Sequence, residues 1–352
     1  MALKPAASCK LIWAGIILVA VWASDQATTS ARTSPMNNNA LMVEKHEQWM
    51  FEFGRDYNDD ADEKAKRLEI FSDNVEYIES FNDATAGAKS YKLGLNKFAD
   101  LTNEEFRASR NGYKLPEFRQ NYPSMSLINY EESDDVPSSI DWREEGAVTG
   151  VKSQGECGGC WAFSAVAAVE GINKLKTNEL VSLSEQELLD CDTSLNRGCN
   201  GGTINYAFDF ITHNGLSSDY EYPYKGFVNG TCRARGTTNA AIKIKGYKSV
   251  PFKSESALLI AVAKQPVSVA IDSSGPEFQF YSKGVFNGVC GTELDHGVAV
   301  VGYGEDNGIK YWLVKNSWGP EWGEEGYIKL QRDIDAPEGL CGIAMSAAYP
   351  TA

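Results

Sequence analysis

The chain has 352 residues, of which 43% are hydrophobic and 23% are charged, values that are ordinary for a globular protein. Forty-eight acidic against 33 basic residues give a formal net charge of −15, which argues against non-specific binding to nucleic acids or anionic membranes. Histidine occurs only at positions 46, 213 and 296, and this scarcity argues against a metal site built from several histidines.

The first 23 residues have the pattern of a secretory signal peptide. Lys4 and Lys10 precede an apolar run from Leu11 to Ala23. As a helix this run would span about 20 Å, less than the roughly 30 Å hydrocarbon core of a bilayer. A cleaved signal is therefore favoured over a membrane anchor, and we expect cleavage near Ala23 and no membrane attachment afterwards.

The rest of the N-terminal part is predicted to be mainly helical. Apolar residues recur at helical spacing from residue 41 onwards, and a second helix is predicted from Asp62 to Phe81. Residues 91–95 have the pattern of a short strand, and residues 103–108 that of a further helical turn. The polar, acidic and proline-containing segment 114–135 predicts an exposed, cleavable linker. A new domain is expected to begin near Val136.

The part beyond residue 135 changes from helical to β patterns along its length. Helices are predicted over residues 160–176, from a capping box at 184–187, and over 204–214. Strands are predicted over residues 267–271, 297–303, 310–315 and 326–330. A helical half followed by a β half predicts two packed lobes with a cleft between them.

The cysteines also divide the chain. Cys9 would leave with the signal, and no cysteine occurs between residues 24 and 156. In a secreted chain, an odd number of remaining cysteines predicts disulfides and one free thiol. The seven that remain are Cys157, Cys160, Cys191, Cys199, Cys232, Cys290 and Cys341.

Cys160 is the candidate nucleophile. It follows Gly158-Gly159 at the point where a turn enters a helix, and the positive end of a helix with its unpaired N–H groups lowers the pKa of a thiol. One alternative is that Cys157 and Cys160 are both structural, and another is that they form a redox pair. Five further cysteines and the absence of a thioredoxin-like pattern argue against the redox pair.

His296 is the candidate base. His213 stands at the end of a predicted helix, where a histidine usually is a solvated cap, whereas His296 begins an apolar strand. That strand returns at Asn307-Gly308. A two-residue turn would pair residues whose numbers sum to 615, and a four-residue loop would give 613. Either register brings Asn316 near His296, where its amide oxygen can hold an imidazole N–H.

Together these segments resemble the papain family of cysteine proteases. Residues 136–352 resemble its mature enzyme, and residues 24–135 its inhibitory propeptide. The resemblance implies an α+β, two-lobe fold, with a helical lobe, an antiparallel β-barrel-like lobe and the active site in the cleft, preceded by a small helical propeptide domain. In the mature part it rests on Asp141-Trp142-Arg143, Cys199-Asn200-Gly201-Gly202 and Asn316-Ser317-Trp318-Gly319. In the propeptide it rests on two motifs, Glu63, Arg67, Phe71, Asn74, Ile78 and Asn82, then Gly94, Asn96, Phe98 and Asp100.

The resemblance implies a role for each site residue. Cys160 attacks as a thiolate, His296 is its acid–base partner, Asn316 orients His296, and Trp318 shields that hydrogen bond. Gln154 and the Cys160 backbone N–H form the oxyanion hole. It implies no metal or cofactor. The implied disulfides are Cys157–Cys199, Cys191–Cys232 and Cys290–Cys341.

The resemblance also implies a substrate-binding site and partners. Gly202 and Asp295 would hold the substrate backbone. An apolar pocket would take the second residue before the scissile bond, the P2 residue. The partners would be polypeptide substrates, the enzyme's own propeptide and cystatin-type inhibitors, and the enzyme would be a monomer. The residues expected around the pocket are Thr203, Ile204, Ala270, Leu294, Gly297 and Ser346.

Four further expectations concern the destination, a glycosylation sequon, Gly159 and maturation. A signal peptide and disulfides imply the secretory pathway, with a vacuole, lysosome or the exterior as destination. Asn229 begins a glycosylation sequon. Gly159 stands where the family usually has Ser or Ala, and we expect activity to be retained. Maturation is expected near Asp135–Val136 in acid, through loss of contacts that lower the pKa of Asp100.

The leading functional hypothesis is an endopeptidase made as a zymogen. The alternative is a catalytically weak relative that acts as a storage or binding protein. Such relatives normally lack the nucleophile or the base, and Cys160, His296, Asn316 and Gln154 are all present here.

Overall fold

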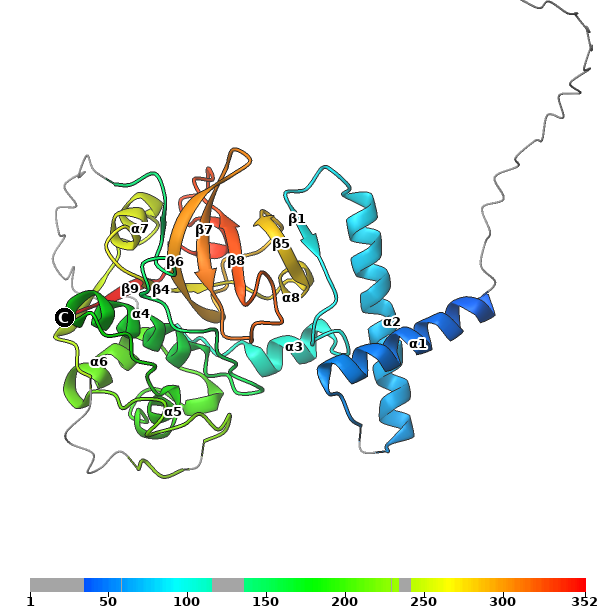
Figure 1. Ribbon diagram of the computed structural model, residues 1–352, viewed down its shortest axis with the longest axis horizontal. Coiled ribbons are helices and arrows are strands. Elements are labelled where there is room, and N and C mark those ends of the chain that lie inside the picture. Colours follow the sequence, from blue (N-terminus) through cyan, green and yellow to red (C-terminus); the bar gives the residue numbers. More distant parts are fainter. Residues whose placement is uncertain (1–34, 58, 116–135, 229, 234–241) are drawn as a thin grey trace, which may run out of the picture. The chain divides into compact units, whose positions relative to one another are not determined.

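The computed structural model of the chain is shown in Figure 1 and describes residues 35–57, 59–115, 136–228, 230–233 and 242–352. It divides into two compact units, Met1–Lys45 and His46–Ala352, and every site discussed below belongs to the second. The predicted signal peptide, most of the linker and the sequon residue Asn229 lie outside the described residues. Within the described ranges, no helix is long and apolar enough to cross a membrane.

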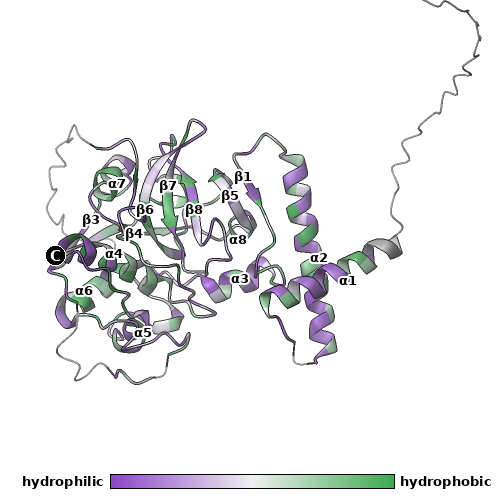
Figure 2. Ribbon diagram, viewed as in Figure 1, coloured by the Kyte–Doolittle hydropathy of each residue, from purple (hydrophilic) through white to green (hydrophobic). Residues whose placement is uncertain are grey.

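The N-terminal part contains three helices and one strand in its described residues. They are α1 (Pro35–Phe53), α2 (Ala61–Ala84), β1 (Tyr91–Leu93) and α3 (Asn103–Arg110). Hydrophobic and hydrophilic residues alternate in bands along α2 (Figure 2), and the apolar bands bury Phe71, Val75 and Ile78. Asp60 starts α2 by accepting hydrogen bonds from the backbone N–H groups of residues 62 and 63.

An aromatic cluster joins α1 to α2. Trp49 and Phe71 lie with ring centroids 5.3 Å apart, and His46 and Phe71 lie 4.9 Å apart. The indole N–H of Trp49 donates to the backbone oxygen of Asn96 at 2.9 Å, which ties the following loop to the same cluster. This small core therefore positions the segment that leads into α3.

Arg67 holds α3 against α2. Its guanidinium donates to Glu63 at 2.6 Å, to Glu105 at 2.8 Å and to the backbone oxygen of Asp100 at 2.9 Å. Glu105 also belongs to a complete capping box with Thr102 at the start of α3. The direction of α3, which carries the chain toward residues 110–114, therefore depends on Arg67 and Glu63 of the first N-terminal motif and on Asp100 of the second.

The C-terminal part begins with a helical lobe. Its main helices are α4 (Cys160–Thr177), α5 (Glu185–Cys191) and α6 (Ile204–Asn214), and the short 3₁₀ turn η2 (Gly198–Asn200) lies between the last two. Ser184 caps α5 as predicted, but the Glu187 carboxylate accepts from Ser217 instead of completing the capping box. The other helical segments are α7 (Glu255–Val262), α8 (Pro276–Gln279) and η3 (Leu340–Gly342).

Nine strands of the described chain form one sheet, in the order β1-β5-β8-β7-β6-β4-β9-β3, with β2 beside β6. The sheet is open, where the expectation was an antiparallel, barrel-like lobe, and its pairs are antiparallel except β5 with β8, which are parallel. The strands of the C-terminal part are β2 (Ile140–Asp141), β3 (Gly246–Ser249), β4 (Val267–Ile271), β5 (Tyr281–Phe286), β6 (His296–Asp306), β7 (Ile309–Lys315), β8 (Tyr327–Gln331) and β9 (Ala347–Thr351).

The β6–β7 hairpin has the two-residue turn that the sequence allowed. Asn307 and Gly308 have φ angles of 50° and 80°, as the favoured hairpin turns require. Pairing follows the 615 register from Asp306↔Ile309 to Gly302↔Leu313, and a bulge then shifts it by one residue. The hairpin returns the chain to Asn316 beside the start of β6.

Three disulfides join the pairs that the resemblance implies. They are Cys157–Cys199, Cys191–Cys232 and Cys290–Cys341. Within the described residues Cys160 is the free cysteine, and it is buried.

The aromatic cluster gives a test of what holds the N-terminal part together. Phe71 is completely buried, whereas Phe51 on α1 is 91% exposed. Phe71→Ala should destabilise this part by about 3–5 kcal/mol because it removes a ring and leaves a cavity. Phe51→Ala should change the free energy of unfolding little. Thermal unfolding of the full-length protein would measure both, and equal effects would contradict the packing described here.

Candidate active site

Cys160 lies at the N-terminus of α4 and is completely buried. Burial raises the pKa of its thiol to about 11, although backbone N–H groups of Gly297, Gly112 and Trp161 donate toward the sulfur and oppose that rise. The thiol is therefore neutral in this state. Of these donors, the N–H groups of Gly297 and Trp161 lie within residues 136–352 and can stabilise a thiolate once water enters.

Gly159, which precedes Cys160, has an ordinary backbone conformation with φ of −88°. A β-carbon added there would lie 3.2 Å from Leu189 Cδ2 and 3.4 Å from the Cys157 sulfur. This position therefore does not require glycine for its backbone, and the glycine removes no group that the site uses.

His296 lies at the first position of β6 and is also completely buried. Its Nε2 lies 2.8 Å from Asn316 Oδ1, and the Trp318 ring stacks on the imidazole at a centroid distance of 4.5 Å. Burial lowers the pKa of His296 to about 4, against the opposing effect of the Asn316 hydrogen bond. The structure thus brings together His296 and Asn316, which the hairpin register placed near one another, and adds the Trp318 ring beside them.

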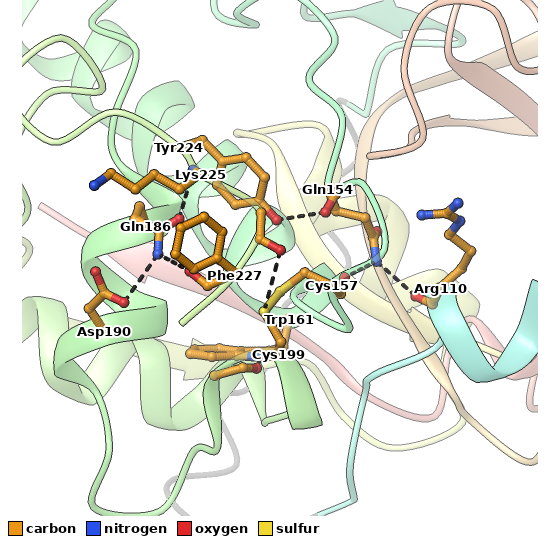
Figure 3. The surroundings of a disulfide bond; sticks show 12 residues. Arg110, Gln154, Cys157, Trp161, Gln186, Asp190, Cys199, Tyr224, Lys225 and Phe227 are labelled. Atoms are coloured by element: carbon orange, nitrogen blue, oxygen red, sulfur yellow. Dashed lines mark hydrogen bonds between the residues drawn. A yellow bond between two sulfur atoms is a disulfide. The ribbon is translucent and has the colours of Figure 1, made fainter. Parts of the chain in front are cut away.

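Gln154 presents its amide N–H₂ group to the cleft. Ser317 Oγ donates to Gln154 Oε1 at 2.7 Å, and this contact leaves Nε2 to donate to the backbone oxygens of Arg110 at 2.8 Å and Cys157 at 2.9 Å (Figure 3). The carbonyl group of Arg110 therefore occupies a donor that the resemblance assigns to the oxyanion hole.

Residues 110–114 run through the cleft as an extended segment. The Gly202 N–H donates to Gly112 O at 2.9 Å, and Gly202 O accepts from Lys114 N–H at 2.9 Å. Asp295 accepts from Tyr113 N–H through its backbone oxygen at 2.9 Å and from the Asn111 amide through Oδ2 at 2.7 Å. Gly202 and Asp295, the residues expected to hold a substrate backbone, here hold this segment.

Tyr113 fills the predicted apolar pocket. Its side chain is 4% exposed and belongs to one buried cluster with Ile204, Ala270 and Leu294. Its hydroxyl lies 2.8 Å from Ser346 Oγ. Two other predicted residues are close by, since Thr203 Oγ1 donates to Lys114 O at 2.8 Å and Gly297 packs against Cys160.

Sequence reasoning missed Asn111, Gly112 and Tyr113 as site residues, as well as the role of Ser317 in orienting Gln154. Glycine is required at position 112, because a β-carbon there would lie 1.9 Å from Gly158 O, but this requirement is visible only in the folded structure.

Asp100 does not behave as the acid-trigger expectation required. Arg55 lies 3.3 Å from its carboxylate and the Tyr57 hydroxyl donates to it at 3.2 Å. Burial outweighs both contacts and raises the pKa of Asp100. A carboxyl group with a raised folded pKa binds protons more tightly in the folded state, so acid removes no stability through it. The predicted trigger at Asp100 is therefore wrong.

Comparisons with known proteins agree with this geometry. Residues 136–351 match the papain family cysteine protease domain, and residues 46–106 match the cathepsin propeptide inhibitor domain. The chain belongs to the papain family of cysteine proteases. It is 56% identical to vignain from Ricinus communis over 293 residues, which cover 82% of this chain and 80% of vignain.

Solved structures of precursors have the same fold. A recombinant stem bromelain precursor is 48% identical, with a TM-score of 0.80, and the match covers 88% of this chain and 99% of that one. The Amb a 11 cysteine protease of ragweed pollen, in its proform, is 44% identical with a TM-score of 0.80, and 88% and 94% of the two chains are covered. This chain is thus a papain-like cysteine endopeptidase zymogen with a propeptide inhibitor domain.

His46 is one group in this zymogen's propeptide whose titration opposes folding in acid. Its imidazole is 1% exposed, and burial lowers its pKa, with Glu47 opposing and Lys64 adding to the shift. Tyr57 Oη lies 3.5 Å from its Nε2. Because the folded pKa is depressed, the stability that this group contributes is full above the ordinary value of 6.5 and is lost as pH falls through the folded value.

His46→Gln should therefore shift the midpoint of acid-induced propeptide release to lower pH, because the side chain stays polar but no longer titrates. Asp100→Asn should not produce that shift. His213→Gln, at an exposed helix end, is the matched control. Release can be followed by tryptophan fluorescence in the Cys160→Ala zymogen, and an unchanged midpoint in His46→Gln would refute the assignment.

Proposed function

We propose that the mature enzyme hydrolyses peptide bonds through an acyl-enzyme on Cys160. The Cys160 thiolate attacks the scissile carbonyl carbon, and the oxyanion accepts hydrogen bonds from Gln154 Nε2 and the Cys160 backbone N–H. His296, as imidazolium, gives its proton to the leaving amine. Water then attacks the thioester and gives a proton to His296, which frees the carboxylic acid product. The contact that carries this assignment is His296–Asn316, shielded by Trp318.

In the zymogen, burial by residues 110–114 keeps this machinery neutral. Cys160 and His296 are each fully buried, with their pKa values moved to about 11 and about 4. Both shifts have desolvation as their first cause. Removal of the segment admits water, which lowers the pKa of the thiol and raises that of the imidazole. The ion pair therefore forms when the propeptide leaves.

The P2 pocket is proposed to take apolar and aromatic side chains. Its lining residues Ile204, Ala270 and Leu294 carry no charge and are buried, so a basic side chain would be desolvated without a counter-ion. Tyr113 in the zymogen supports this proposal, since an aromatic ring fits the pocket and its hydroxyl reaches Ser346.

The pocket leads to a prediction about tyrosine. Ser346→Ala should reduce kcat/KM for a substrate with Tyr at P2 by roughly 2- to 10-fold, the value of one neutral hydrogen bond. The matched substrate with Phe at P2 should be nearly unaffected. A peptide library read with both enzymes makes the measurement. Preference for Arg or Lys at P2 would contradict the pocket assignment.

A second prediction separates the two histidines of the mature domain. Alkylation of Cys160 in the mature enzyme should be fast below pH 6. In His296→Ala it should fall by roughly 300-fold at pH 6, because a thiol with a pKa of ~8.5 is only about 0.3% ionised there. Asn316→Ala should give an intermediate loss, because the base remains but is misoriented.

His213→Ala is the control for that series. Its ring contacts Asp209 O at 2.7 Å at the end of α6 and is exposed, so alkylation should be unchanged. Fast alkylation that persists in His296→Ala would mean that the wrong histidine has been assigned. Unreactive Cys160 in the parent mature enzyme would instead favour the storage or binding alternative.

We also propose a division of the chain into a signal peptide at residues 1–23, a propeptide at 24–135 and the mature enzyme at 136–352. Three disulfides support passage through an oxidising compartment, with a vacuole, lysosome or the exterior as destination. Glycosylation at Asn229 is supported by the exposure of Gly230 and Thr231 in the same sequon. Cystatin-type inhibitors are proposed to compete for the opened cleft of the monomeric enzyme.

A further inference from the structure

A cavity of about 240 Å³ lies where the propeptide meets the mature domain, away from the P2 pocket. The propeptide contributes Phe53, Arg55, Lys97, Phe98 and Arg110, and the mature domain contributes Ser153, Gly155, Glu156 and Trp318. Three of these nine residues are cationic and only Glu156, which is exposed, is anionic. The cavity wall is therefore rich in hydrogen-bond donors.

Arg110 is the group in this wall that needs a partner. It is 6% exposed, its Nε has no hydrogen-bond acceptor, and no carboxylate lies within 4.0 Å of its guanidinium in the described parts of the chain. Its cation lies over the Phe98 ring at 5.1 Å. Burial lowers its pKa, and Glu156 and Asp100 oppose this effect, both from beyond ion-pair distance.

The other cations of the wall have counter-ions, but donors remain unused around them. Arg55 lies 3.3 Å from Asp100, and Lys97 lies 3.6 Å from Glu321. Arg55 Nε and Trp318 Nε1 are nevertheless buried without an acceptor. The cavity wall thus contains the buried Arg110 guanidinium, which has no ion pair, and further N–H donors without acceptors. The one carboxylate in its lining is that of Glu156.

We propose that this cavity binds a small inorganic oxyanion, such as sulfate or phosphate, through Arg110 and Lys97. A tetrahedral oxyanion supplies the acceptors that the wall lacks, and guanidinium groups bind such oxygens through charge-assisted hydrogen bonds. Because Arg110 and Lys97 come from the propeptide, whereas Ser153, Gly155, Glu156 and Trp318 come from the mature domain, the complete site exists only in the zymogen. Bound oxyanion therefore stabilises the latent form and slows release of the propeptide.

Mass action sets the size of this effect. A ligand that binds the closed zymogen alone lowers the population of the open form by a factor of 1 + [L]/Kd, which is about 100-fold at a concentration of 100 times Kd. The zymogen would thus stay latent in a compartment rich in the oxyanion and activate after dilution.

The test uses the full zymogen with Cys160→Ala, so that its outcome does not depend on catalysis. Sulfate is the probe, because it stays dianionic in acid, and chloride at equal ionic strength is the reference. Sulfate should raise Tm along a saturable curve and give a one-site isotherm by titration calorimetry. Arg110→Gln and Lys97→Gln should each remove the saturable part or weaken it at least 10-fold.

Lys92→Gln is the matched control, since Lys92 is an exposed propeptide lysine outside the cavity and its loss should leave the curve unchanged. Sulfate also stabilises proteins by exclusion from their surface, but that effect rises without saturation and is shared by all variants. If Arg110→Gln fails to fold, Lys97→Gln decides the result. A linear rise of equal slope in every variant, or an equal response in the isolated mature domain, would overturn the proposal.

Discussion

The close approach of α4 to β6 is the constraint on which the site depends. A β-carbon at Gly297 would lie 3.1 Å from Cys160 O and 3.3 Å from Trp161 Cα, so glycine allows the helix end to lie against the strand. The strand begins one residue earlier with His296, and the hairpin returns Asn316 to its side. The close approach at Gly297 therefore places the N-terminus of α4, the His296 imidazole and the Asn316 amide side by side.

The same donors serve inhibition and, by our proposal, catalysis. Gln154 donates to the carbonyl of Arg110, and Gly202 and Asp295 hold residues 111–114. Residues 110–114 need no binding surface of their own, because they use the same polar groups that the cleft presents to an extended substrate. The zymogen therefore stays inactive only while the aromatic core around Phe71 holds residues 110–114 in place. The stability of the propeptide thus controls the exposure of Cys160.

Local patterns were sufficient to predict much of the site. The helix at Cys160, the strand at His296 and the turn at Asn307-Gly308 each follow from neighbouring residues, and the hairpin register brought Asn316 into place. The contact between Tyr113 and Ser346 joins residues 233 positions apart, and no short-range pattern carries it. The prediction for Asp100 was wrong for a different reason. The direction of its pKa shift depends on the balance between burial and ion pairing, and only the packing of the folded chain determines that balance.

The pairing of β1 with β5 has a consequence for the enzyme after maturation. In the zymogen the short propeptide strand covers one side of β5, and β8 covers the other. Departure of the propeptide converts β5 into an edge strand whose backbone N–H and C=O groups face water, a surface on which other extended chains can pair. Gly284, with a φ of 89°, bends that edge, and the exposed Lys283 adds charge to it. These two features discourage the mature enzyme from associating with itself or its substrates along β5.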